Sequence, residues 1–257
     1  MVSTTSERPD KFRIGRVFND SFAVIGRNAV LCLGLAALFS GLPTLVFQLW
    51  ALRQDPAFDP GTFGEQDLVF GYSSVAIGAG LASYILSLLL QASLVRATIE
   101  DLNGKQPSFG DSIAKAVSFL LPTFAIALLV GLGVGLGFML FVVPGIMLAL
   151  RWSVAVPALV QERLGVFGSM ARSRDLTKGS RWALFGLFVI LIVAAIAIEL
   201  ALGTATDLFG GTVGAVVDAL ATSVTSMVMS IAAAVSYVEL RQVREGTGID
   251  ELAEIFA

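Results

Sequence analysis

Long apolar stretches separated by short polar segments dominate the sequence. A helix that spans a bilayer takes about 17 to 25 mostly apolar residues, and six stretches meet this length. They lie at about residues 28–50, 72–97, 117–138, 143–161, 182–203 and 212–239. Only the tight turn FVVPG joins the third stretch to the fourth. We therefore predict an all-α integral membrane protein with six transmembrane helices arranged as three hairpins.

Short segments with a shared pattern precede the first, third and fifth of these stretches. Each begins with a phenylalanine followed by small or polar residues: FNDSFAVIGRN from Phe18, FGDSIAKAVSF from Phe109 and FGSMARSRDLTKG from Phe167. Around the first segment, apolar residues recur at helical spacing on one face and charged residues occupy another. This pattern is typical of a helix that lies in the membrane interface. We expect each hairpin to follow such an interfacial helix.

Two of the segments carry signals for a helix end. The second starts at PSFGD, where Ser108 can cap the helix and Asp111 fits the third position of a capping box. The third ends at Gly179, which is suited to the left-handed conformation that closes many helices.

The three segments divide the chain into repeat-like units at about residues 12–103, 104–162 and 163–242, followed by a short cytoplasmic tail at 243–257. A true threefold repeat is one interpretation. The alternative is that any chain re-entering a bilayer carries an amphipathic lead-in. On either interpretation, residues 1–257 form a single polytopic membrane domain.

Basic residues fall almost entirely on one side of this topology. In this six-span scheme, 15 of the 17 lysines and arginines lie on the same side of the membrane as the N-terminal segment. Arg53 lies on the other side among acidic residues, and Arg151 lies within the fourth span. The positive-inside rule therefore predicts that both ends of the chain are cytoplasmic.

The cations on that side can also form a basic collar at the inner leaflet. Anionic lipid attracts each nearby lysine or arginine by about 1 kcal/mol. The interfacial basic residues are Arg13, Arg16, Arg27, Arg172, Arg174, Lys178 and Arg181. We expect them to contact anionic lipids of the cytoplasmic leaflet; the alternative is that they only set the topology.

Composition disfavours most catalytic chemistry. The chain is 56% hydrophobic and 14% charged, well away from the average soluble domain. It has no histidine and a single cysteine, Cys32, so the commonest general base and the usual metal ligands are missing. No GxSxG motif occurs, and no lysine lies within a span beside a serine. We predict no catalytic residues, no cofactor and no metal. A net charge of −3 gives no reason to expect nucleic acid.

Small residues in two spans predict close helix contacts. The third span holds two overlapping GxxxG pairs, formed by Gly131, Gly133, Gly135 and Gly137. Such pairs allow helix backbones to approach closely, whereas a phosphate-binding loop would need a preceding strand. The sixth span carries a stripe at three- and four-residue steps: Ala219, Ser223, Ser226, Ser230 and Ala233. This stripe is either a packing seam or one wall of a polar path.

Arg151 is a permanent cation within an apolar stretch. At 1.5 Å per residue from Gly145, it lies about 9 Å below the outer edge of the membrane. Asp218 and Glu199 fall at similar depth, and an unpaired charge there costs a few kcal/mol or more. We therefore predict that Asp218, Glu199 or both bridge Arg151. The three would form an ion pair that locks spans four to six, or line a polar cavity or ion path. Snorkelling of Arg151 to the outer headgroups is a third alternative.

Other polar residues and prolines mark local features. Glu162, just past the inner end of span four, is expected to bind the following cytoplasmic segment through Arg172 or Arg174. Gln91 lies deep in span two with no assignable partner. Pro43, Pro122 and Pro157 are expected to bend their spans, because each removes a backbone donor.

Residues Pro144 to Trp182 carry a family resemblance. The PGI turn at Pro144, the Arg151–Trp152 pair, PALVQE and the R-S-x-x-L-T-x-G of Arg172 to Gly179 resemble a large prokaryotic family. It includes the membrane domain attached to some glycerophosphoryl diester phosphodiesterases, and YciC-like integral membrane proteins. The resemblance implies six spans in the bacterial cytoplasmic (inner) membrane. The fused phosphodiesterase domain relies on histidines and carboxylates, so its activity is not transferred to this histidine-free chain.

These observations favour a non-enzymatic polytopic inner-membrane protein that engages lipid or protein partners, in envelope organisation or lipid-linked processes. A second copy of the chain or another membrane protein is the alternative partner to lipid. The runner-up function is a channel or transporter for a small solute, ion or lipid, with a polar path near Arg151, Asp218 and Glu199. An intramembrane enzyme ranks third.

Overall fold

The computed structural model describes residues 11–53, 65–209 and 211–245, with side chains given for 11–50, 77–202 and 211–245. Over these residues the chain is helical, with no strand. The elements are α1 (Ile14–Arg27), α2 (Ala29–Ala36), the π-helical turn η1 (Ala37–Gly41), α3 (Leu42–Arg53), α4 (Glu65–Leu102), α5 (Phe109–Leu140), α6 (Val142–Arg151), α7 (Ala155–Glu162), α8 (Gly165–Thr177), α9 (Arg181–Phe209) and α10 (Gly211–Glu245). The tail predicted at 243–257 lies outside the described residues beyond Glu245.

Six stretches of the described chain are long and apolar enough to cross a membrane. They are Ala29–Trp50, Ile77–Leu102, Phe109–Leu140, Val142–Glu162, Arg181–Leu202 and Gly211–Glu245. Each coincides with one of the stretches found in the sequence, so the prediction of an all-helical protein with six candidate spans is confirmed.

Two of these spans are interrupted where proline removes a backbone donor. In the first, the π-helical turn η1 precedes Pro43, whose ring would crowd the carbonyl of Phe39 in a regular α-helix. In the fourth, α6 ends at Arg151 and α7 begins at Ala155, with Pro157 in the first turn of α7. Proline is tolerated there because the first turn needs no intrahelical donor. Pro122, by contrast, lies within the continuous helix α5.

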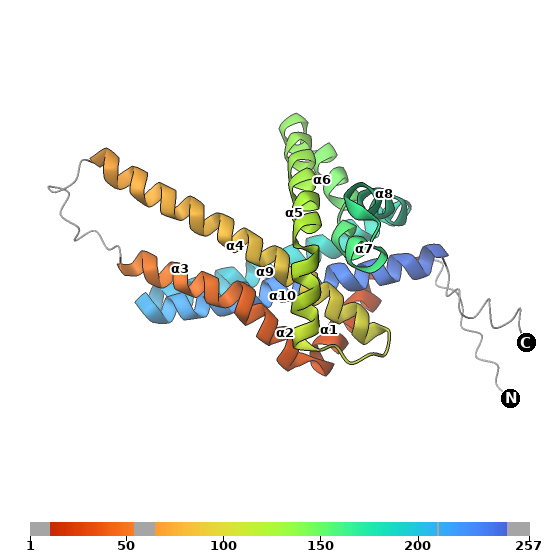
Figure 1. Ribbon diagram of the computed structural model, residues 1–257, viewed down its shortest axis with the longest axis horizontal. Helices are drawn as coiled ribbons and strands as arrows, with labels where there is room; N and C mark the ends of the chain where they lie inside the picture. Colours follow the sequence, from red (N-terminus) through yellow and green to blue (C-terminus); the bar gives the residue numbers. More distant parts are fainter. Residues whose placement is uncertain (1–10, 54–64, 210, 246–257) are drawn as a thin grey trace, which may run out of the picture.

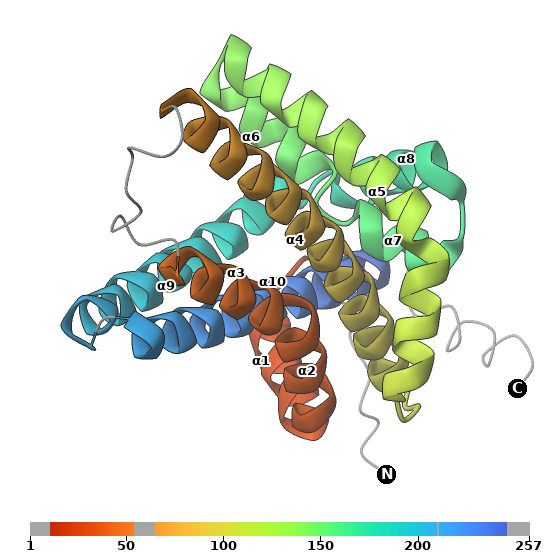
Figure 2. The same ribbon diagram turned by 60° about the vertical axis from the view of Figure 1, so that its left-hand side comes forward.

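Helix α10 lies at the centre of the helix bundle. Helices α3, α4, α9 and α10 extend along the long axis of the molecule, and the α5–α6 hairpin stands across them (Figure 1). The turned view shows α9 and α10 side by side, with α5 and α6 towards the edge (Figure 2). In the most apolar window of each span, 56% of the residues are buried in α10 but only 11% in α5. The core is therefore built around α10, and α5 presents most of its apolar surface outward.

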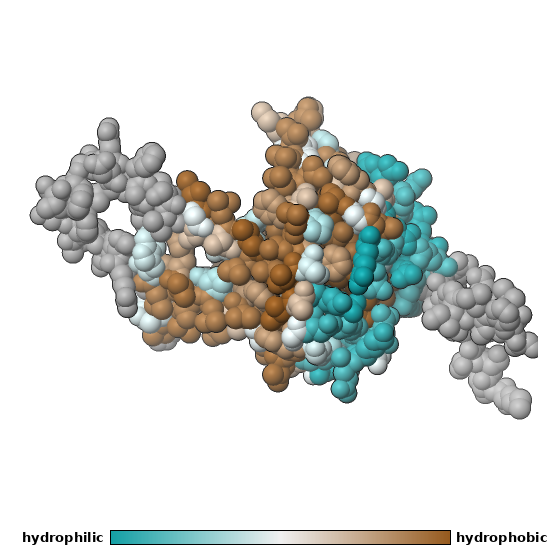
Figure 3. Space-filling model, viewed as in Figure 1, coloured by the Kyte–Doolittle hydropathy of each residue, from teal (hydrophilic) through white to brown (hydrophobic). Residues whose placement is uncertain are grey.

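Polar residues gather at one end of the molecule. Figure 3 shows hydrophilic residues over α8 and the α4–α5 connection, next to a largely hydrophobic surface. At this end the backbone amide of Arg13 donates to Glu239, whose carboxylate lies 3.4 Å from the Arg16 guanidinium. The beginning of α1 and the last turns of α10 therefore meet. This agrees with a topology in which both ends lie on one side of the membrane.

The lead-in segments take two different forms. The first and third form the separate helices α1 and α8, whereas the second forms the first turns of α5. That helix begins as predicted, because the Ser108 hydroxyl accepts a hydrogen bond from the backbone N–H of Asp111 at 3.2 Å. Gly179, after the end of α8, has the predicted left-handed conformation with φ of 94°. The threefold repeat itself stays a prediction.

One of the two GxxxG pairs makes a close helix contact. A Cβ at Gly137 would lie 2.9 Å from the Cα of Gly145 in α6, and one at Gly133 would lie 2.6 Å from the ring of Trp152. At Gly131 and Gly135 a Cβ would meet nothing within 4 Å. The pair Gly133/Gly137 therefore packs α5 against its hairpin partner, and Gly131/Gly135 faces away from it.

The serine stripe of α10 packs largely as a seam against the interrupted first span. Gly41 of η1 approaches the hydroxyl of Ser223, and the hydroxyls of Ser40 and Ser226 lie 3.5 Å apart. The hydroxyls of Ser223 and Ser230 donate to carbonyls one turn earlier, at Ala219 and Ser226. Intrahelical bonding of this kind lets hydroxyls lie in an apolar interior.

Substitution of the buried glycine by alanine tests the α5–α6 contact. Gly137→Ala is expected to lower the free energy of unfolding by about 1–3 kcal/mol, because the new methyl overpacks the backbone of Gly145. The matched change Gly135→Ala is expected to be neutral or to stabilise by up to about 1 kcal/mol, through helix propensity alone. Thermal unfolding in detergent measures both, and equal melting temperatures for the two variants would refute the contact.

Candidate functional site

Ion pairs cluster at the polar end, and several of them join different helices. Those among the described residues are Arg16–Glu239, Arg27–Asp101, Arg96–Glu100, Arg172–Glu162, Arg172–Glu245, Arg174–Asp175 and Arg241–Glu245. Together they connect α1, α4, α7, α8 and α10. Arg53 and the acidic residues that accompany it in the sequence lie outside the described side chains.

Glu162 at the end of α7 is the centre of one network. Its Oε1 accepts a hydrogen bond from Nε of Arg172 at 2.8 Å and another from the hydroxyl of Tyr237 at 2.6 Å. Arg172 also pairs with Glu245. Partial burial alone would lower the pKa of Arg172, but its hydrogen bonds to Glu162 and Glu245 hold that pKa above its ordinary value. The network binds α7, α8 and α10 together.

The predicted attachment of the cytoplasmic segment is therefore made by Arg172. Its side chain is only 25% exposed. Arg174 is 50% exposed and pairs with its own neighbour Asp175 at 3.3 Å. An exposed pair of this kind contributes about 0–1 kcal/mol at most.

A second network joins α1 to α4. The Arg27 guanidinium donates to the carboxylate of Asp101, from Nε at 3.2 Å, and this hydrogen bond raises the pKa of Arg27. The amide of Asn28 donates to the same carboxylate at 2.7 Å. The end of the first lead-in helix is thereby fixed to the C-terminal end of α4.

The seven predicted collar residues differ in what they contact. Arg16, Arg27 and Arg172 are engaged in ion pairs that join helices. Arg13, Arg174 and Lys178 have exposed side chains. Arg181 is half-buried, and its Nε is buried without a hydrogen-bond partner among the described residues.

Arg151 lies at the break in the fourth span. It is the last residue of α6, and its carbonyl accepts a hydrogen bond from the hydroxyl of Ser173 in α8 at 3.0 Å. A cation at the C-terminal end of a helix interacts favourably with the helix dipole. Nε of Arg151 is buried, and neither an ion pair nor a hydrogen bond to it occurs within the described chain.

Arg151 forms no ion pair with Asp218 or Glu199, so the predicted bridge between them is absent from the described residues. Asp218 instead accepts a hydrogen bond from the amide of Gln48 in α3, and Glu199 is exposed on α9. The depth count assumed a straight span parallel to the others. Because the hairpin stands across the bundle and α6 ends at Arg151, that residue lies beside α8 (Figure 1).

Gln48 is a partner that sequence reasoning missed. It is a polar residue close to the end of an apolar span, two positions before Trp50. Counting residues from the outer end of each span, as was done for Asp218, also places Gln48 near the outer end of its span. Matching polar residues of either kind, charged or neutral, would have identified this pair.

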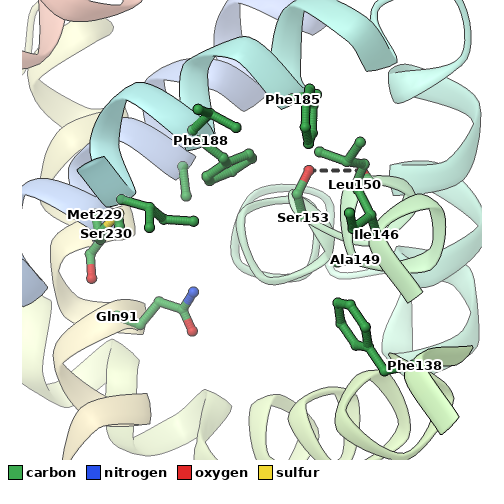
Figure 4. A pocket seen from close by; sticks show the side chains of 13 residues that line it. Gln91, Phe138, Ile146, Ala149, Leu150, Ser153, Phe185, Phe188, Met229 and Ser230 are labelled. Atoms are coloured by element: carbon green, nitrogen blue, oxygen red, sulfur yellow. Dashed lines mark hydrogen bonds between the residues drawn. The ribbon is translucent and has the colours of Figure 1, made fainter. Parts of the chain in front are cut away.

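A cavity of about 530 Å³ lies where α6 crosses α9 and α10. Its lining is mostly apolar: Gln91, Phe138, Ile146, Ala149, Leu150, Ser153, Phe185, Phe188, Val189, Ile192, Met229, Ser230 and Ala233. Figure 4 shows the Gln91 amide pointing into the space, and it has no hydrogen bond within the described chain. The hydroxyl of Ser153 already donates to the carbonyl of Leu150 at 3.0 Å. Pockets of this size and lining suit apolar or amphipathic ligands.

A second cavity of about 310 Å³ adjoins the first and leads towards the polar end. The two share Ile146, Leu150 and Phe185. Arg181 and Trp182, at the beginning of α9, complete the lining of the second cavity together with Val143 and Met147. The apolar space beside α9 therefore ends at a cation.

Comparison with known proteins places the chain in a family. Residues 63–233 match the model of a family described as "Uncharacterised protein family (UPF0259)". The chain belongs to this family. A UPF0259 membrane protein of Pectobacterium carotovorum is 34% identical over 98 residues, which cover 38% of this chain and 39% of that protein. The matched part of this UPF0259 chain thus spans about two fifths of that relative, and no solved structure matches the chain.

The family match supports the UPF0259 assignment. It supports a bacterial membrane protein of the UPF0259 family with several apolar helices. The resemblance to the membrane domain attached to glycerophosphoryl diester phosphodiesterases and to YciC-like proteins stays an expectation from the sequence.

Replacement of each arginine of α8 tests which one fixes that helix. Arg172→Ala is expected to cost about 1.5–3 kcal/mol of unfolding free energy, because it removes charge-assisted hydrogen bonds from partly buried carboxylates. Arg174→Ala, the matched control, is expected to cost about 0–1 kcal/mol. Denaturant titration of the purified protein in detergent measures both values. Losses of equal size would contradict the assignment.

Proposed function

We propose that this UPF0259 protein is a non-enzymatic, multi-pass protein of the bacterial cytoplasmic membrane that binds anionic lipid at the inner leaflet. Its polar end, with both ends of the described chain, faces the cytoplasm. The single observation that carries the proposal is that exposed cations and exposed aromatic side chains occur together in the segments at the polar end.

Exposed aromatic residues support an interfacial position for the lead-in segments. Phe22 of α1 is 60% exposed, Phe109 at the start of α5 is 41% exposed and Phe167 of α8 is 77% exposed. Trp182, at the start of α9, is 86% exposed. Aromatic side chains of this kind are enriched at the level of the lipid headgroups. Each lead-in segment thus presents an apolar side chain to the membrane beside its basic residues.

Charge supports anionic lipid as the partner. Arg13 just before α1, Arg174 on α8 and Lys178 just after α8 are exposed. Among the described residues, the side chains of the three form none of the ion pairs that join helices. Positive charge at the inner leaflet is attracted by its anionic lipids. The same distribution favours the cytoplasmic orientation of this end.

The distribution of apolar surface favours lipid over a protein partner. Exposed large apolar side chains occur on α2, α4, α5 and α9, as Val30, Leu81, Leu121 and Val193 illustrate. A protein interface is a contiguous patch, whereas a lipid-facing surface surrounds the bundle. The second copy of the chain remains the alternative partner, on the outward face of α5.

A channel or transporter finds less support. A polar path was expected to pass Arg151, Asp218 and Glu199. Among the described residues, Asp218 is bonded to Gln48, Glu199 is exposed on α9 and Arg151 lies beside α8. Three polar groups at separate places do not form the wall of one path.

Selectivity for anionic lipid tests the proposal. In vesicles of phosphatidylcholine with a minority of phosphatidylglycerol, spin-labelled phosphatidylglycerol is expected to associate with the protein more strongly than spin-labelled phosphatidylcholine. The triple variant Arg13→Gln, Arg174→Gln, Lys178→Gln is expected to reduce this preference, since each removed charge is worth about 1 kcal/mol of attraction. Electron paramagnetic resonance measures the bound fraction of each lipid.

A charge-preserving variant is the control. Arg13→Lys, Arg174→Lys and Lys178→Arg keep the charges and are expected to keep the preference. A wild-type protein with no preference for phosphatidylglycerol would refute the proposal, as would equal preference in the glutamine variant.

A further inference from the structure

The two cavities share Ile146, Leu150 and Phe185 and lie along α9; we call them together the α6–α9 groove. We propose that it seats a single anionic glycerophospholipid of the inner leaflet, with its phosphate at Arg181 and an acyl chain along α9. The inference rests on the proposed function and deepens it, because it names one specific lipid site in addition to the general attraction at the collar.

The groove follows one face of α9. Arg181, Phe185, Phe188 and Ile192 line the cavities at steps of four, three and four residues, which places them on the same side of the helix. At 1.5 Å per residue, the face from Arg181 to Ile192 is about 16 Å long. The opposite wall is the short helix α6, through Ile146 and Leu150. The groove therefore follows α9 from Arg181 at its beginning to Ile192, about three turns further along.

Its shape and opening suit an acyl chain. The lining side chains are predominantly apolar, and Phe138, Val189 and Ile192 are exposed at its edge. The groove is thus accessible from the apolar surface, where lipid chains surround the protein. The atoms that line an unfilled apolar space lack dispersion contacts on that side, so an acyl chain that fills the space is stabilising.

The polar end of the groove suits a phosphate. Arg181 is half-buried and its Nε has no acceptor in the described part of the chain. It is also the first residue of α9, where the helix dipole disfavours a cation and favours an anion. A phosphate placed there would satisfy the planar guanidinium and the positive end of the helix together. Trp182 beside it is exposed, and tryptophan is enriched at the level of the lipid headgroups.

Paired ligands separate the headgroup contact from the chain contact. The full-length protein is purified in detergent, and native mass spectrometry measures the binding of phosphatidylglycerol and of diacylglycerol with the same acyl chains. The Arg181→Gln variant is expected to bind phosphatidylglycerol about tenfold more weakly, because one charge-assisted contact is lost. Its binding of diacylglycerol is expected to be unchanged. Lys105→Gln is the matched control, because Lys105 is exposed, does not line the groove and is not one of the seven collar residues. It is expected to change neither.

Cavity-filling variants test the seat of the chain. Ala149→Phe fills the groove from α6, and Val189→Trp fills it from the exposed edge of α9, where a larger side chain can be accommodated. Both are expected to weaken binding of both lipids by tenfold or more, about 1.4 kcal/mol. Thermal unfolding without added lipid identifies a variant that does not fold. If one of the two fails to fold, lipid binding by the other variant tests the seat of the chain.

The outcomes are distinct from those of the spin-label experiment. Unchanged phosphatidylglycerol binding in Arg181→Gln overturns the headgroup assignment, and unchanged binding in the folded cavity-filling variant overturns the chain assignment. A wild-type protein that retains no phosphatidylglycerol but still shows anionic preference in vesicles overturns the groove alone. Loss of that preference in vesicles overturns the proposed function.

Discussion

Moving a charged side chain from water into hydrocarbon costs a free energy of about several kcal/mol or more. The positions of the charged residues in the described chain follow from this cost. The ion pairs gather at one end, where they join α1, α4, α7, α8 and α10. Even Arg151, which interrupts an apolar stretch, lies beside the basic helix α8. The remaining length of the spans is left to apolar packing around α10, with small residues at its contacts. The polar end thus fixes the mutual positions of these five helices.

The break in the fourth span connects this architecture to the candidate site. Because Pro157 cannot continue the hydrogen bonding of α6, the chain turns at residues 152–154 and α6 departs from the axis of the bundle. Its crossing with α9 leaves the apolar space that begins at Arg181. The proposed collar and the proposed lipid site share one property: both would use cations that form no ion pair between helices. Arg181 differs from Arg13 or Lys178 in lying at the end of a cavity.

Features that depend on local sequence could be predicted, and features that depend on helix crossing could not. Apolar length alone identified all six spans, and the proximity of Glu162 to Arg172 in the chain identified their contact. The Ser108 cap followed from a motif of four residues. Pairing of Arg151 with Asp218 required a shared depth in parallel spans, which the inclined α6 does not provide. The groove has no periodic signal, because its walls come from five helices and the turn that follows α6. Gln91 alone hinted at it, as a polar side chain without a partner.

Cysteine accessibility in intact cells tests the central claim most directly. In a variant whose only natural cysteine, the buried Cys32, is changed to serine, single cysteines replace Lys11, Arg244 or Thr212. A membrane-impermeant maleimide applied to spheroplasts is predicted to label the cysteine at 212 at once. Those at 11 and 244 should react only after the membrane is permeabilised. Labelling of either 11 or 244 in intact spheroplasts would contradict a cytoplasmic polar end, and the assignment of its cations to the inner leaflet with it.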